Sequence, residues 1–181
     1  QPALTVSHPT AAVTVVIETT AGTITAEIDQ ARAPISSANF LHYVDQKMYD
    51  GGRFHRAVRL DNQVRQDVKI EVVQAGRDPE RAKTEKGFGP ITLERTSATG
   101  LRHVDGALSM ARSGPDTATS DFFICVGDQP SLDFGGAPIL HIHGTQLNVS
   151  RVIDYPVEVI SVSDRLPGNP SLAQLREMTS K

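Results

Sequence analysis

The sequence predicts a mainly β fold, either a barrel or a sandwich. Short stretches rich in β-branched and apolar residues recur along the chain, and turns containing Gly, Pro or Asp separate them. Few stretches show a helical period, so a fold of alternating strands and helices is not indicated. A closed barrel would also leave no sheet edge exposed to aggregation. The 181 residues are the size of one domain with a substantial core.

The first element is a predicted β-hairpin. Residues 13–18 and 23–28 are β-branched and apolar, and the connection between them ends in Gly22. A tight turn between two antiparallel strands needs a residue with positive φ. Glycine adopts this conformation without a steric penalty.

One amphipathic helix is predicted over residues 36–48. Pro34 lies where a first helical turn begins, and the serines that follow it are candidates for the N-cap. Apolar residues recur at steps of three and four positions, which is the helical period; they are Phe40, Leu41, Val44 and Met48. The run from Tyr49 to Gly52 ends the helix in a turn.

The remaining elements are short strands. They are predicted at residues 54–58, 70–74, 91–93, 107–110, 122–126 and 157–162. Residues 61–67 and 77–89 are polar and are expected to be protruding loops, and residues 171–178 a short terminal helix or a frayed tail. We expect a flexible leader over 1–12, one domain over 13–165 and a tail over 166–181.

Composition excludes several classes of function. A net charge of −3 does not favour a general nucleic-acid binder, and no apolar run approaches the roughly 20 residues of a membrane span. Cys125 is the only cysteine, so no intrachain disulfide forms, and its apolar neighbours predict a buried, inert thiol. The chain begins at Gln1, either as a mature end or as an arbitrary boundary. We expect a monomer in the periplasm or outside the cell, with the cytoplasm as the alternative.

Arg56 is the first candidate functional residue. Strand alternation would place Phe54, Arg56 and Val58 on one face and His55 and Ala57 on the other. An arginine on such a face is either exposed at a barrel rim or held over an apolar pocket, where it can donate hydrogen bonds to a ligand. Residue type alone leaves both interpretations open.

Six segments follow one another in an order typical of a known family. They are the first hairpin, Ala33-Pro34 with Ala38-Asn39-Phe40, residues 49–56, Val73-Gln74-Ala75-Gly76, Gly106-Ala107-Leu108-Ser109-Met110-Ala111, and Ser120-Asp121-Phe122-Phe123-Ile124. Through them, most of residues 13–136 resembles the cyclophilin-type peptidyl-prolyl cis-trans isomerases of bacteria. The resemblance implies a closed, eight-stranded antiparallel barrel capped by two helices.

The resemblance also implies a function and its residues. The expected activity is acceleration of X-Pro bond rotation in proline-containing polypeptides, which assists protein folding and needs no cofactor or metal ion. Arg56, Gln74 and Phe123 match the family's catalytic positions. The implied substrate-binding residues are Phe54, Val72, Met110, Ala111, Asp121 and Leu132.

Several positions depart from the family pattern. Residues 59–69 form a polar insertion, Glu71 stands where an aromatic residue is common, and Asp121 replaces a common glutamine. Ser131 replaces Trp or Phe, so affinity for the family's cyclic-peptide immunosuppressant is expected to be poor. From Ala137 onward the pattern is atypical, and only residues 148–153 indicate a shortened helix.

Two alternatives follow from these departures. The groove could hold proline-containing peptides without accelerating isomerisation, as a binding module or chaperone. His141 or His143 is expected to complete the pocket. Both face the same way on a strand-like segment and could ligate a metal ion, but without a clear third ligand the default interpretation is no metal site.

Overall fold

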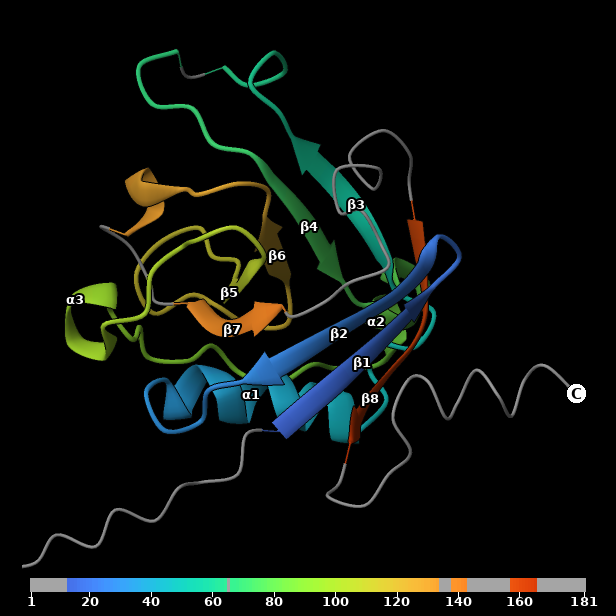
Figure 1. The fold of residues 1–181 in the computed structure, drawn as a ribbon. Coiled ribbons are helices and arrows are strands. Elements are labelled where there is room, and N and C mark those ends of the chain that lie inside the picture. The colour runs from blue at the N-terminus through green and yellow to red at the C-terminus, as the bar shows by residue number, and fades with distance from the viewer. Residues whose placement is uncertain (1–12, 65, 134–137, 143–156, 166–181) are drawn as a thin grey trace, which may run out of the picture.

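A computed structural model describes residues 13–64, 66–133, 138–142 and 157–165 of the chain (Figure 1). The described strands are β1 (Val13–Thr19), β2 (Gly22–Ile28), β3 (Arg53–Val58), β4 (Val72–Gly76), β5 (Ala107–Met110), β6 (Phe122–Cys125), β7 (Pro138–Ile142) and β8 (Val157–Arg165). The described helices are α1 (Pro34–Asp45), α2 (Pro79–Thr84), α3 (Thr96–Thr99) and the 3-10 turn η1 (Pro130–Leu132). The mainly β fold predicted from the sequence is confirmed.

All strand pairs are antiparallel, and every strand has two hydrogen-bonded neighbours. The strand order is β1-β2-β7-β5-β6-β4-β3-β8, and β8 pairs back onto β1. Strands β3, β4, β6 and β5 therefore lie side by side, although β4 and β6 are far apart in the sequence. These four strands carry the candidate site described below.

The core lies between the strands and α1, which runs across one end of the sheet in Figure 1. Its centre is aromatic: the Phe122 ring meets those of Phe40 and Tyr49 edge-on, with centroids 5.4 Å apart in both pairs. Phe54 packs edge-on against Phe122 from β3. One set of residues on β3 and β6 thus points into the core, and the alternate residues lie on the outer face of the sheet.

The predicted hairpin forms as β1 and β2, in register from Val13 with Ile28 to Thr19 with Gly22. Gly22 has a φ of 133°, as the turn was expected to require. The Thr19 hydroxyl donates to the Gly22 carbonyl oxygen across the turn at 2.7 Å.

Helix α1 begins two residues earlier than predicted and ends three residues earlier, at Asp45. Pro34 occupies its first turn as expected, but the expected serine cap is wrong. Ala33 is the N-cap and makes no side-chain hydrogen bond. Instead, Glu94 accepts hydrogen bonds from the backbone N–H groups of Ile35 and Ser36, at 3.0 and 2.7 Å.

Two strand predictions also need correction. Strand β4 begins at Val72 rather than at residue 70, because the Ile70 N–H donates to the Gln63 side chain instead of a neighbouring strand. The predicted strand at 91–93 is reduced to one bridge between Ile91 and Ala118.

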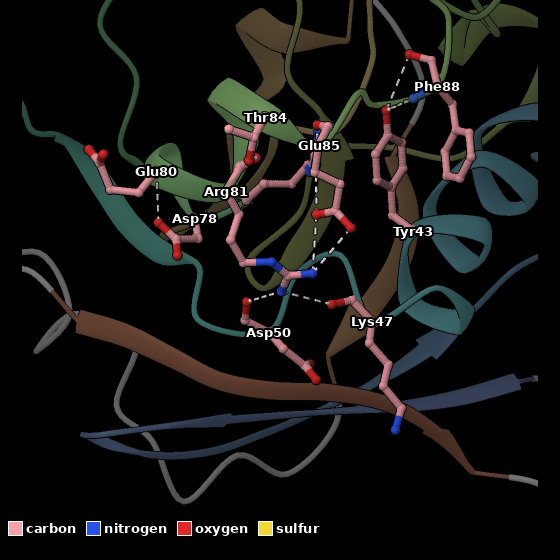
Figure 2. Close-up of polar contacts among 10 residues, drawn as sticks. Tyr43, Lys47, Asp50, Asp78, Glu80, Arg81, Thr84, Glu85 and Phe88 are labelled. Carbon is pink, nitrogen blue, oxygen red and sulfur yellow. Dashed lines mark hydrogen bonds and ion pairs between the residues drawn. The ribbon is translucent and has the colours of Figure 1, made fainter.

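The predicted protruding loop at 77–89 contains α2 and is held against the turn that follows α1. Asp78 caps α2 by accepting from the Glu80 N–H at 2.9 Å. Figure 2 shows Arg81 reaching back from α2 to the carbonyl oxygens of Lys47 and Asp50, at 3.3 and 2.9 Å. A short helix rather than an open loop therefore follows β4.

No described helix is long and apolar enough to cross a membrane. The predicted leader, the shortened helix at 148–153 and the terminal element at 171–178 lie outside the described residues.

Candidate active site

A β-bulge in β3 decides which way Arg56 points. Phe54 pairs with Ala75 and Arg56 with Gln74, so His55 is an extra residue in the ladder. Phe54 is buried in the core, whereas Arg56 is exposed on the outer face. The prediction that both share one face is therefore wrong, because the bulge breaks strict alternation.

Four side chains form a cross-strand row on the outer face. The pairings run from Arg56 on β3 to Gln74 on β4, from Gln74 to Phe123 on β6, and from Phe123 to Ser109 on β5. Directly paired residues of neighbouring strands lie on the same face with Cβ atoms about 5 Å apart. A guanidinium, an amide and an aromatic ring thus lie next to one another, although their positions in the sequence are 56, 74 and 123.

Polar contacts link one end of this row. The Arg56 Nη1 donates to the Gln74 Oε1 at 3.4 Å, and the Gln74 Nε2 donates to the Asp121 Oδ2 at 3.2 Å. The same Asp121 oxygen is 3.5 Å from the His55 Nε2. Gly76 leaves room for this carboxylate, since a Cβ there would collide with Asp121. The amide of Gln74 is therefore oriented with its oxygen towards Arg56.

An open cavity of about 260 Å³ adjoins the other end of the row. It is lined by His103, Ser109, Met110, Arg112, Phe123, Ser131 and Leu132. Two of these residues, Phe123 and Leu132, also pack with Ile70 against a small apolar cluster formed by Val58, Val72, Ala107 and Cys125. The cavity thus has an aromatic wall and an aliphatic wall, and both walls are backed by buried apolar side chains.

The structure brings most of the predicted site residues to this face. Phe123, Leu132 and Met110 line the cavity, and Val72 lies in the cluster beneath Phe123. The Ala111 N–H donates to the Asp121 carbonyl oxygen at 2.7 Å at the edge of the site. The exception is Phe54, whose ring packs in the core against Phe122, away from this face.

Sequence reasoning missed His103. Its ring stacks parallel to that of Phe123 with centroids 5.9 Å apart, and its Nδ1 is 3.0 Å from the Asp133 Oδ1. Burial lowers the pKa of His103, although the hydrogen bond to Asp133 acts in the opposite direction. A neutral ring that donates from Nδ1 to Asp133 therefore backs the Phe123 wall. No local motif marks this residue in the sequence.

The two histidines expected near the pocket, His141 and His143, differ in how far the structure describes them. His141 lies on β7, paired with Ala107 and Glu27, and His143 lies outside the described residues. The His141 side chain is not among the described parts of the chain, so the expectation that His141 or His143 completes the pocket stays a prediction.

The two unusual residues near the pocket differ in their placement. Ser131 lines the cavity, so a small hydroxyl takes the place of a large aromatic side chain. Glu71 is half-buried at the start of β4, where its N–H donates to the Gln129 Oε1 at 3.0 Å. Within the described ranges, no three His, Cys, Asp or Glu residues gather closely enough to hold a metal ion.

Comparisons with known proteins agree with this geometry. Residues 14–149 match the family model of the cyclophilin-type peptidyl-prolyl cis-trans isomerases. The chain is 37% identical over 122 residues to a peptidyl-prolyl cis-trans isomerase A of Dickeya dadantii, covering 67% of this chain and 58% of that protein. It is 31% identical over 170 residues to a peptidyl-prolyl cis-trans isomerase of Acinetobacter baylyi, covering 91% and 84%.

Solved structures share the fold. A cyclophilin-type isomerase of Cryptosporidium parvum superposes with a TM-score of 0.70 at 20% identity, covering 88% of this chain and 99% of that one. A cyclophilin of Hirschia baltica gives 0.64 at 16% identity, covering 82% and 72%. Fold and outer-face site define a cyclophilin-fold protein. The family match is specific: this chain belongs to the cyclophilin-type peptidyl-prolyl cis-trans isomerases.

Proposed function

We propose that this chain is a peptidyl-prolyl cis-trans isomerase that accelerates rotation about X-Pro bonds in polypeptides and so assists their folding. The observation that carries the proposal is the cross-strand row Arg56–Gln74–Phe123 beside a cavity walled by Phe123 and Leu132. A structure of the Cryptosporidium parvum relative was determined in the presence of the dipeptide Ala-Pro, which fits a proline-binding groove.

The reaction needs a twist and breaks no bond. Rotation about the peptide C–N bond costs about 18–20 kcal/mol because resonance gives that bond partial double-bond character. The two planar X-Pro isomers differ by only about 0.5–1 kcal/mol, so the obstacle is kinetic. A catalyst therefore has to bind the twisted state more strongly than either planar isomer.

Arg56 suits that task. Its guanidinium is exposed on the outer face and points along the row towards Gln74. A hydrogen bond to the prolyl nitrogen would favour a localised lone pair and weaken the resonance. Because arginine stays charged at every physiological pH, it supplies this donor without a proton transfer.

The neighbouring groups would hold the substrate in place. Phe123 and Leu132 offer apolar walls for the proline ring, and the buried apolar cluster packs against both of them. Gln74, oriented by Asp121, can contact the flanking peptide. An acceleration of about 10⁵-fold requires about 7 kcal/mol, which several preorganised hydrogen bonds in a partly dehydrated groove can supply.

We further propose that the strands close into an eight-stranded barrel capped by two helices. The pairing of β8 with both β1 and β3 supports closure, and α1 covers one end of the core.

The test is the cis-to-trans rate of an Ala-Pro peptide with the native protein, with Arg56→Ala and with Arg53→Ala. Arg53 is a matched control because it is an exposed arginine on the same strand. We expect the native protein and Arg53→Ala to accelerate the reaction, and Arg56→Ala to lose at least tenfold in kcat/KM. A folded native protein without acceleration would refute the proposal.

Peptide affinity separates an enzyme from a binding module. We expect Arg56→Ala to bind a proline-containing peptide about as tightly as the native protein while its turnover falls. Phe123→Ala is expected to lose both affinity and turnover, because Phe123 walls the cavity. Equal losses of affinity and turnover in Arg56→Ala would point to ground-state binding instead.

A further inference from the structure

The connection between β3 and β4 exposes an unusual amount of apolar side chain. Leu60, Val64 and Val68 are 50%, 98% and 40% exposed. Among the described residues only four large hydrophobic side chains are at least 40% exposed, and three of them fall within residues 60–68. Single exposed apolar residues need no explanation, but this local concentration does.

The same connection is held in shape by its own polar side chains. Gln63 donates to the carbonyl oxygens of Arg59 and Ile70, at 2.6 and 2.9 Å, and accepts from the Ile70 N–H at 3.1 Å. Lys69 donates from Nζ to the Leu60 carbonyl oxygen at 2.7 Å. The two ends of the connection, residues 59–63 and 69–70, are therefore braced against one another.

This braced segment is continuous with the candidate active site. Ile70, at its base, packs against the same apolar cluster as Phe123 and Leu132, which line the cavity. Leu60 follows Arg56 by four residues, so their Cα atoms are at most about 14 Å apart. Figure 1 shows the connection projecting from β3 and β4 at the end of the sheet away from α1.

We propose that Leu60, Val64 and Val68 bind apolar side chains of the same unfolded polypeptide whose proline occupies the cavity. This inference rests on the proposed isomerase function and adds a second contact surface to it. The occupant is an extended chain with apolar residues about four or more positions from its proline. A peptide that ends beside its proline has no side chain that can reach Leu60, Val64 and Val68. The segment would thus favour unfolded proteins over short peptides, because apolar groups leave water when they bind.

The experiment compares three peptides with the full chain. One has four residues around Ala-Pro; one is long, with leucines at the fifth and sixth positions on both sides of the proline; the third has serines in place of those leucines. The enzyme variant is Leu60→Ser/Val64→Ser/Val68→Ser, which keeps Gln63 and Lys69. Ile35→Ser is the matched control, since Ile35 is 43% exposed on α1.

For the leucine-bearing peptide we expect the triple variant to lose about tenfold in kcat/KM, or about 1.4 kcal/mol. The four-residue and serine-bearing peptides should change less than twofold, and Ile35→Ser should leave all three rates unchanged. An unchanged rate for the leucine-bearing peptide would overturn the inference.

Two further outcomes are distinguishable. If the native protein fails to turn over even the four-residue peptide, the proposed isomerase function is what has failed. If the native protein sediments as a dimer that the triple variant dissociates, a second copy of the chain occupies the segment and the inference is wrong.

Discussion

At the scale of single residues, His103 is a titratable group in the lining of the cavity. Its buried ring stacks on that of Phe123, and the carboxylate of Asp133 and the guanidinium of Arg112 act on it from neighbouring segments. Desolvation outweighs the attraction of Asp133, so the folded protein holds the His103 pKa below its ordinary value. The Phe123 wall therefore rests on a neutral ring.

This shift predicts a pH dependence of stability. Below the unfolded-state pKa of about 6.5, the unfolded chain binds a proton that folded His103 resists, so the free energy of unfolding falls as the pH falls. Urea unfolding from pH 8 to pH 5 should show a steeper decline for the native protein than for His103→Asn. The excess slope is at most about 1.4 kcal/mol per pH unit. Parallel curves for the two proteins would contradict a buried, neutral His103.

Asp121 shows how one substitution changes a site without changing the fold. Its carboxylate holds the Gln74 amide and faces His55, and its side chain is 40% exposed. A negative charge consequently stands beside the end of the row where a substrate's flanking residues would lie. Because it is partly exposed, its influence on charged substrates is modest and screened by salt.

At the scale of elements, helix α1 depends on a residue distant in sequence. Glu94 accepts from two N–H groups in the first turn, which no local side chain caps. A carboxylate at a helix N-terminus also interacts favourably with the helix dipole. Glu94, in the segment before α3, therefore helps to fix the position of α1 and of the aromatic core residue that α1 supplies, Phe40.

Glu94→Ala should lower the free energy of unfolding by about 1–2 kcal/mol, because it removes the cap of α1. Glu80→Ala is the control: its ion pair with Lys83 lies on the surface, where such pairs contribute about 0–1 kcal/mol. Urea unfolding at pH 7 measures both. A loss in Glu94→Ala no larger than in the control would show that the cap contributes little.

At the scale of the whole molecule, the strand order buries the small apolar cluster of Val58, Val72, Ala107 and Cys125 as well as the inner core. Cys125 belongs to that cluster and is fully buried, and its burial raises the pKa of the thiol to about 12. Reactivity of a thiol requires its thiolate form and access to reagent. While the strands around Cys125 stay paired, its thiol stays protonated and reagents cannot reach it.

Alkylation of Cys125 should consequently report on opening of the molecule. At pH 8 we expect native protein to react at least about hundredfold more slowly than urea-unfolded protein, where the single thiol is accessible. With added urea, the labelling rate should rise together with the fraction unfolded by circular dichroism. Rapid labelling of the native state would show that β6 opens locally.

Local patterns in the sequence determined a large part of the fold. The hairpin with its positive-φ Gly22, the helix after Pro34 and the strands around Arg56, Gln74 and Phe123 were all predictable, because alternation, helical period and turn chemistry act between near neighbours. The family segments added the likeness to cyclophilins. They also indicated Arg56, Gln74 and Phe123 as site residues, and the strand pairing places these three in one row.

Only the tertiary structure decided the remainder. The bulge at His55 turns Arg56 away from Phe54, and its place depends on pairing with β4. The Glu94 cap joins residues 58 and 59 positions apart, and the His103–Asp133 contact joins residues 30 apart. Such contacts leave no periodic trace, since they arise when distant segments pack together. The sequence thus determined which elements form, and their packing decided which side chains meet at the site.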